Sequence, residues 1–180
     1  MKVYSLLILY LIIVLPLNAE DGSRLWLRAE ANACADVSAN KKSSIIDVAL
    51  QELRSQWKGG LVKLDLSKDK NVIKLGTDGF VIKGDKDIEV TIQSSGELGL
   101  LYGAYSLLRL QETNDLPKEF KIFDSPKYDL RLLNHWDNLD GTIERGYAGY
   151  SLWKWNELPA IVSPRYKEYA RANASIGING

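Results

Sequence analysis

The sequence lacks several features on which whole classes of proteins depend. Its 180 residues contain a single cysteine, Cys34, so neither an intramolecular disulfide nor a thiolate zinc site can form. With 23 basic and 23 acidic residues the formal net charge is zero, which gives no electrostatic reason to expect binding to nucleic acid or to an anionic membrane. The sequence shows no glycine-rich phosphate loop, no metal-spaced histidines or cysteines and no nucleophile elbow. It therefore predicts no metal and no cofactor.

Long apolar runs are also scarce, and the one at the N-terminus is short. Lys2 supplies a positive charge, Tyr4–Leu15 is almost entirely apolar, and Ala19 provides a small residue at the end. This is the layout of a secretory signal peptide over residues 1–19. The alternative is a retained membrane anchor, but the run is shorter than the roughly 20 residues that span a bilayer. We expect an exported protein, periplasmic or extracellular, with no membrane attachment after cleavage.

The remaining chain has ordinary globular composition, 46% hydrophobic and 26% charged, and divides into two parts. Residues 20–123 are predicted to form an α+β accessory domain with a mainly antiparallel sheet and two helices. Short apolar or alternating stretches, separated by turn residues such as Gly84-Asp85, predict strands with one face toward solvent. The predicted strands are Leu25–Leu27, Leu61–Leu66, Val72–Gly76, Phe80–Ile82 and Ile88–Ile92.

Two helices are predicted to pack on this sheet. One begins at Ser43 or Ser44, because serine is a favoured N-cap, and its apolar residues recur at helical spacing. Gly59-Gly60 is predicted to end it as a left-handed C-cap. The other spans Gly96–Gln111 and has two apolar stripes, so little of it can face water. Two glycines four residues apart would let another backbone come close to this second helix, Gly99 and Gly103.

Residues 124–180 are predicted to start a second domain, which follows a linker at Leu116–Tyr128. Leu130–Trp136 is predicted to be a strand, Pro164–Asn173 a helix, and Ala174–Asn179 the beginning of the next strand. Strand, loop, helix and strand form one β/α unit. The loop between the first strand and the helix is far longer than is usual for such a connection, and long loops of this kind commonly carry function.

Within that unit, Asn134–Gly149 concentrates carboxylate, amide, aromatic and guanidinium groups directly after the apolar strand. A sugar needs this mixture, because an aromatic face covers the ring while carboxylates and amides bind the hydroxyl groups. An acidic sugar also needs a fixed cation, which arginine supplies in bidentate form. The segment therefore predicts a carbohydrate site.

Three stretches carry a more specific resemblance: LLNHWDNLDGTIERGYAG from Leu132, SLWKWNELP from Ser151 and RYKEYARANASIGING from Arg165. They resemble the start of the catalytic domain in α-glucuronidases of glycoside hydrolase family 67, and we expect a bacterial member. These enzymes release glucuronic acid or its 4-O-methyl ether from xylan side chains.

This resemblance implies an inverting hydrolase whose substrates are glucuronoxylan oligosaccharides, the aldouronic acids. It makes residues 124–180 the first β/α unit of a truncated (β/α)8 barrel. The two catalytic carboxylates of the family come from later barrel strands, so none is assigned here, and the 180-residue chain alone is expected to be inactive. Whether the full-length enzyme is a homodimer stays open.

The resemblance also implies which residues bind the substrate. Trp136 matches an aromatic residue that lines the pocket around the methyl-ether side of the sugar, although a core position is the alternative. Arg145 would hold the uronate carboxylate or orient a neighbouring acid, and Glu144 would accept hydroxyl hydrogens. An ion pair between Glu144 and Arg145 that braces the loop is the alternative. Of Asp137 and Asn138, one would reach the ligand while the other caps the turn.

Other candidates in this region have structural alternatives. Trp153, with Tyr150 and Trp155, would supply a wall for the xylan backbone or instead fold the long loop onto the domain. Asn179 would line the site from the top of the second strand. His135 is the only histidine, and we expect it to be a hydrogen-bonded structural residue.

Two other functions stay open at this point. The stretch SSGELGLLYGAYSLLRL is similar to accessory domains that precede the barrel in hexosaminidases, so a related barrel glycosidase is one alternative. A non-catalytic sugar-binding fragment is the other. The IERGYAG and RANASIGING motifs favour the α-glucuronidase.

Overall fold

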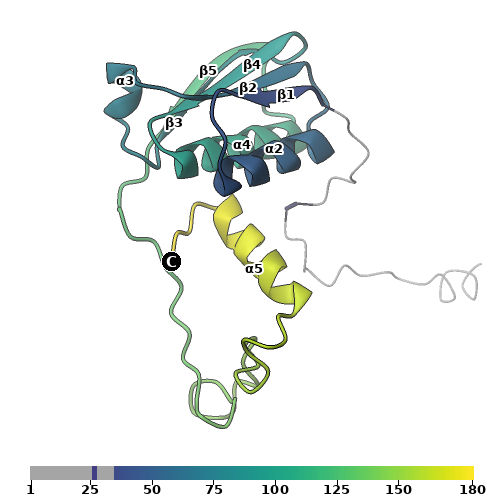
Figure 1. The fold of residues 1–180 in the computed structure, drawn as a ribbon, viewed down its shortest axis with the longest axis vertical. Helices are drawn as coiled ribbons and strands as arrows, with labels where there is room; N and C mark the ends of the chain where they lie inside the picture. The colour runs from purple at the N-terminus through teal and green to yellow at the C-terminus, as the bar shows by residue number, and fades with distance from the viewer. Residues whose placement is uncertain (1–25, 28–34) are drawn as a thin grey trace, which may run out of the picture.

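The computed structural model describes residues 26–27 and 35–180, and a five-stranded mixed sheet lies at its centre (Figure 1). The strand order is β1-β2-β4-β3-β5. β2 pairs in parallel with β1 and β4, whereas β3 pairs antiparallel with β4 and β5. The strands are β1 Val37–Ala39, β2 Leu61–Leu66, β3 Phe80–Asp85, β4 Glu89–Ser94 and β5 Glu119–Asp124. The helices are α2 Ser44–Gln56, α3 Lys70–Ile73, α4 Glu97–Glu112 and α5 Pro164–Ser175.

One face of the sheet forms the core of this domain. Alternation along β2 places Val62 and Leu64 on the same face, where they pair with Val90 and Ile92 of β4. These four side chains, and Ile82 of β3, are at most 1% exposed. Helices α2 and α4 cover this face side by side (Figure 1). Burial of branched apolar side chains between the sheet and two helices therefore holds the domain together.

Helix α2 begins as predicted but ends differently. The Ser43 hydroxyl accepts a hydrogen bond from the amide of Ile46 at 3.2 Å, which caps the helix. At the other end Trp57 has φ of −72°, so Gly59-Gly60 does not form the predicted left-handed cap. The glycines are needed for a different reason: the amide of Gly60 donates to the carbonyl of Lys86 at 2.8 Å, and a side chain there would collide with the neighbouring backbone.

Helix α4 is buried on both of its predicted apolar stripes. A Cβ at Gly99 would collide with the Ser94 hydroxyl and the carbonyl of Gly79, and one at Gly103 would collide with Ile92. The close approach of another backbone, predicted from these glycines, is therefore confirmed for Gly99. It brings the first turn of α4 onto the residue that precedes β3.

Several predictions about the sheet are wrong. Helix α3 and a turn replace the strand predicted at Val72–Gly76, and the N-cap Asp69 accepts from the amide of Asn71 at 2.7 Å. The predicted turn Gly84-Asp85 belongs to β3, where Gly84 has φ of 141°. β1 and β5 were not predicted, because β1 has three residues and β5 lies within the predicted linker. Since α2 crosses from β1 to β2, their pairing is parallel, and the sheet is mixed rather than mainly antiparallel.

The segment 125–180 leaves the sheet and returns as α5, which packs below α2 and α4 on the side away from the sheet (Figure 1). α5 begins at Pro164, as predicted, and Ser163 caps it. The strand predicted at Ala174–Asn179 is wrong, because the helix continues to Ser175 and is followed by Gly177 in a left-handed conformation, with φ of 80°.

Leu130–Trp136 is also not a strand over its predicted length, yet part of it has a strand-like neighbour. The amide of Gly180 donates to the carbonyl of Arg131 at 3.2 Å, and the amide of Leu133 donates to the carbonyl of Gly180 at 3.2 Å. Gly180 therefore bonds to the two residues that flank Leu132, which is the hydrogen-bond pattern of a parallel strand pair. This pairing of Gly180 with the residues on either side of Leu132 is a single bridge, which is too short to count as a strand.

Two predictions concern the N-terminal residues. The predicted signal peptide and Leu25 lie outside the described residues, while Trp26 and Leu27 are described and are not part of a strand. Among the described helices, none combines the length and the apolar composition that crossing a bilayer requires.

Candidate functional site

The loop that follows His135 folds back on itself. Asp137 forms an antiparallel bridge with Ile143, and the amide of Asn138 donates to the carbonyl of Thr142 at 2.8 Å. The amide of Glu144 donates to the carbonyl of Trp136 at 2.9 Å. This fold brings the backbones of Trp136 and Glu144 together, and Glu144 has the left-handed φ of 53° that is uncommon outside glycine.

Asp137 holds the two ends of this loop together. Its Oδ2 accepts hydrogen bonds from the Ser151 hydroxyl at 2.6 Å and from the indole N–H of Trp155 at 3.0 Å. The Ser151 hydrogen bond has the largest effect and lowers the pKa of Asp137, desolvation opposes it, and the Trp155 hydrogen bond lowers the pKa further. Asp137 is therefore an ionised structural acceptor.

Asn138 and Asp140 hold the turn itself. The Asn138 side-chain amide donates to the Thr142 hydroxyl at 2.9 Å and to the carbonyl of Glu144 at 2.8 Å. Asp140 accepts from the Thr142 hydroxyl at 2.7 Å and from its amide at 2.9 Å, and these bonds lower the pKa of Asp140. A general acid needs a raised pKa, so Asp137 and Asp140 are both shifted away from that role.

Three of the predicted site residues remain exposed. Trp136 is 68% exposed, so it is not a core residue of the described structure, and Glu144 and Arg145 are exposed beside it. Among the ion pairs of residues 26–27 and 35–180, none joins Glu144 to Arg145. The loop therefore presents an indole, a carboxylate and a guanidinium to solvent on a backbone held by its other side chains.

The aromatic residues farther along the loop pack against α5. Trp153 lies 4.8 Å from Tyr166 and 5.8 Å from Tyr169, measured between ring centroids. His135 lies edge-on to both Trp153 and Tyr169, and its Nε2 is 2.8 Å from the Tyr169 hydroxyl, so the predicted structural hydrogen bond is present. Of the two alternatives for Trp153, its packing favours folding the loop onto the domain. Trp155 stays 59% exposed.

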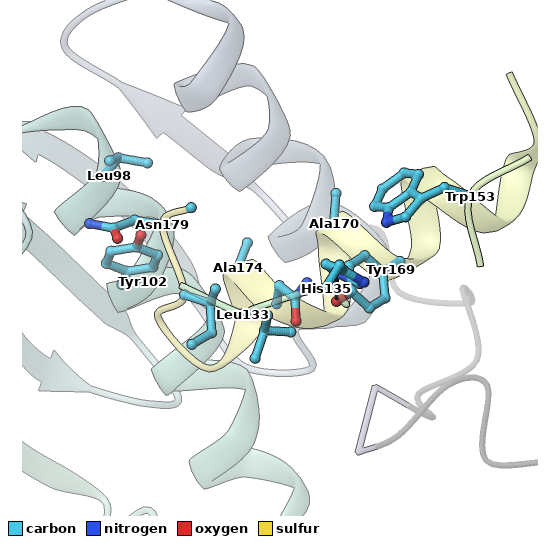
Figure 2. Close-up of a pocket in the computed structure, with 12 residues that line it drawn as sticks. Leu98, Tyr102, Leu133, His135, Trp153, Tyr169, Ala170, Ala174 and Asn179 are labelled. Carbon is cyan, nitrogen blue, oxygen red and sulfur yellow. Dashed lines mark hydrogen bonds between the residues drawn. The ribbon is translucent and has the colours of Figure 1, made fainter. Parts of the chain in front are cut away.

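A pocket of about 430 Å³ lies between α4, α5 and the segment around Leu133. Figure 2 shows Leu98, Tyr102 and Asn179 at one end and His135, Tyr169 and Trp153 at the other. The remaining lining residues are mostly apolar: Leu133, Ala170, Asn173, Ala174, Ile178 and Gly180. Neither Trp136 nor Arg145 lines this pocket.

Asn179, a predicted site residue, is engaged in structural contacts. Its side-chain oxygen accepts from the amide of Arg131 at 2.9 Å, and its side-chain nitrogen donates to the carbonyl of Asp129 at 2.7 Å. Arg131 itself pairs with Asp78 at 2.7 Å. Sequence reasoning missed Arg131 and Asp78, because the two are 53 positions apart and neither lies in a motif.

A metal ion bound by a protein needs a set of ligating side chains that lie close together. Within residues 26–27 and 35–180, no three histidine, cysteine, aspartate or glutamate side chains are grouped closely enough to hold one.

Comparison with known proteins gives this loop a family context. Residues 109–180 match the sequence model of the glycosyl hydrolase family 67 middle domain. The match includes the whole loop and α5, and it begins inside α4.

The chain is also similar to fungal proteins named probable alpha-glucuronidase A. The Aspergillus clavatus protein is 43% identical over 111 residues, 61% of this chain and 13% of the relative. The Aspergillus oryzae protein is 35% identical over 143 residues, 79% of this chain and 16% of the relative. The Aspergillus terreus protein is 30% identical over 198 aligned positions, 90% of this chain and 23% of the relative.

This chain therefore spans about 13 to 23% of the length of these three relatives. Similarity to family 67 and to α-glucuronidases supports the predicted family. The narrower expectation of a bacterial member gains no support from relatives that are fungal.

Proposed function

We propose that this chain is part of an α-glucuronidase that hydrolyses the α-1,2 bond between (4-O-methyl)glucuronic acid and xylose in xylan-derived oligosaccharides. The observation that carries the proposal is the match of residues 109–180 to the family 67 middle domain, because this match contains the exposed indole, carboxylate and guanidinium of the loop.

In this proposal the exposed groups bind the acidic sugar. The Arg145 guanidinium pairs with the uronate carboxylate, since a planar fork of N–H donors matches two carboxylate oxygens. The Trp136 indole covers the apolar face of the sugar and its methyl ether. The Glu144 carboxylate accepts hydroxyl hydrogens, and the bond from its amide to the Trp136 carbonyl at 2.9 Å supports placing both residues at one end of the ligand.

Asp137 and Asn138 contribute mainly by holding the loop. Both hydrogen bonds that the structure gives to the Asp137 side chain fall on Oδ2, so we assign the other oxygen to a sugar hydroxyl. Asn138 is committed to Thr142 and Glu144 and fixes the turn on which Glu144 lies. Neither catalytic carboxylate role is assigned within the loop.

The proposal includes a (β/α)8 barrel that begins in this segment. The parallel hydrogen bonds between Gly180 and the residues on either side of Leu132 support it, with α5 as the crossover helix. Twelve of the sixteen large apolar side chains that are exposed in the described residues lie between positions 128 and 176. Apart from Trp136, which we assign to the sugar, they suit a surface that packs against further barrel elements. We also propose export to the periplasm or the medium.

The test is a hydrolysis assay on protein expressed from the gene's full reading frame. We expect release of glucuronic acid from glucuronosyl-xylotriose and no cleavage of aryl hexosaminides. Loss of a hydrogen bond to a charged group costs about 1.5–3 kcal/mol, so Arg145→Gln should lower kcat/KM about 10- to 150-fold. Arg165→Gln, at an exposed position of α5, is the matched control. Hexosaminidase activity, or equal activity of the two variants, would contradict the proposal.

A further inference from the structure

An ion pair with a buried carboxylate joins α5 to the helices that cover the sheet. Arg171 of α5 donates to both carboxylate oxygens of Glu52 on α2, at 2.6 and 2.8 Å. The Glu52 side chain is 11% exposed, whereas the Arg171 side chain is 35% exposed. The bidentate geometry is the strong form of this interaction, and the hydrogen bond to Glu52 raises the pKa of Arg171.

The other partners of Glu52 in the described structure are neutral. Gln56 donates to Oε2 at 2.5 Å, and the Tyr105 hydroxyl of α4 donates to Oε1 at 3.3 Å. The charge of a carboxylate buried between α2 and α4 is therefore balanced from a residue 119 positions away. A buried carboxylate without its cation is strongly unfavourable, so the packing of α5 against α2 and α4 stabilises the sheet domain.

A second ion pair joins the same two parts of the molecule. Arg131 donates to Asp78, which lies two residues before β3, at 2.7 Å, and both side chains are less than a fifth exposed. The same guanidinium donates to the carbonyl of Gly177 at 2.5 Å and to that of Tyr128 at 2.6 Å. It also lies 5.6 Å from the ring centroid of Tyr102 on α4. Arg131 thus ties the beginning and the end of the 128–180 segment to the sheet domain.

In both pairs the carboxylate comes from the sheet domain and the arginine from the 128–180 segment. Arg131 lies five positions before Trp136, and α5 carries the tyrosines against which Trp153 packs. We propose that the sheet domain sets the position of the candidate loop through these two ion pairs, with Glu52 and Asp78 as positioning residues. Their importance for sugar binding rests on the proposed function, but the coupling itself does not.

The test is hydrogen exchange followed by mass spectrometry on the 180-residue chain. Glu52→Gln keeps the shape of the side chain and removes its charge. We expect amides of α5 to exchange roughly tenfold faster or more, while amides of β2 and β4 keep their rates. The matched control is Glu89→Gln, which removes an exposed pair with Lys63 and should change neither region.

A double variant separates positioning from a general loss of stability. If the ion pair is responsible, Glu52→Gln combined with Arg171→Gln should accelerate α5 exchange no more than either single change does. Asp78→Asn provides an independent variant at the second pair, and we expect it to accelerate exchange in residues 128–149 selectively. Uniform acceleration across the chain, or single effects that multiply in the double variant, would overturn the proposal. Because no ligand is present, failure of the α-glucuronidase assay would leave this outcome unchanged.

Discussion

Replacement of Gly99 by alanine sets two physical effects against each other. In an exposed helix interior, glycine to alanine stabilises by about 1 kcal/mol, because alanine has the higher helix propensity. In α4, however, the new Cβ would collide with the Ser94 hydroxyl and with the carbonyl of Gly79. Ser94 is fully buried and its hydroxyl already donates to that carbonyl at 2.6 Å, so neither group can move away freely.

Overpacking in a filled core costs about 1–3 kcal/mol, which exceeds the propensity gain. We therefore expect Gly99→Ala to lower the free energy of unfolding by up to about 2 kcal/mol net. Urea unfolding followed by circular dichroism measures this change in the free energy of unfolding. The control is Ser106→Ala, on the more accessible side of the same helix. The control should be neutral or slightly stabilising. A Gly99→Ala protein about 1 kcal/mol more stable than the parent would refute the close approach of α4 to the sheet.

Two further predictions follow from the core and from the loop. Ile92→Ala, at a fully buried position of the central strand β4, should lower the free energy of unfolding by about 2–5 kcal/mol in the same urea experiment, and a loss below about 1 kcal/mol would contradict its core position. Because the folded-state pKa of Asp137 is lowered, its contribution is present above the unfolded pKa of about 3.9 and is lost as the pH falls through the folded pKa. The NMR signal of the Trp155 indole N–H should therefore hold its position down to about pH 4 and move below it, and in Asp137→Asn that acid transition should disappear.

The three long helices could be predicted from the sequence because each signal is local. Apolar residues at helical spacing follow a serine cap at Ser43, and Pro164 marks the first turn of α5. The short elements could not be predicted, since β1 has three residues and β5 alternates only weakly between exposed and half-buried positions. Residues 72–76 were mistaken for a strand because their apolar content does not distinguish a strand from one helical turn.

The candidate site was predicted in composition but not in the roles of its members. The motif identified the loop, and Trp136, Glu144 and Arg145 are exposed on it. Which side chains instead hold the loop depends on partners such as Ser151 for Asp137, and sequence spacing does not reveal those contacts. The ion pairs of Glu52 and Asp78 could not be predicted either, because each joins residues far apart in the chain.

The central claim is that the loop binds an acidic sugar through Arg145. The most direct measurement is an NMR titration of the chain with glucuronosyl-xylotriose and with neutral xylotriose, following the Trp136 indole N–H and the Arg145 guanidinium. We predict that only the acidic oligosaccharide shifts both signals, and that Arg145→Gln abolishes the response while Arg165→Gln retains it. Equal shifts with both oligosaccharides, or an unchanged response in Arg145→Gln, would contradict the account.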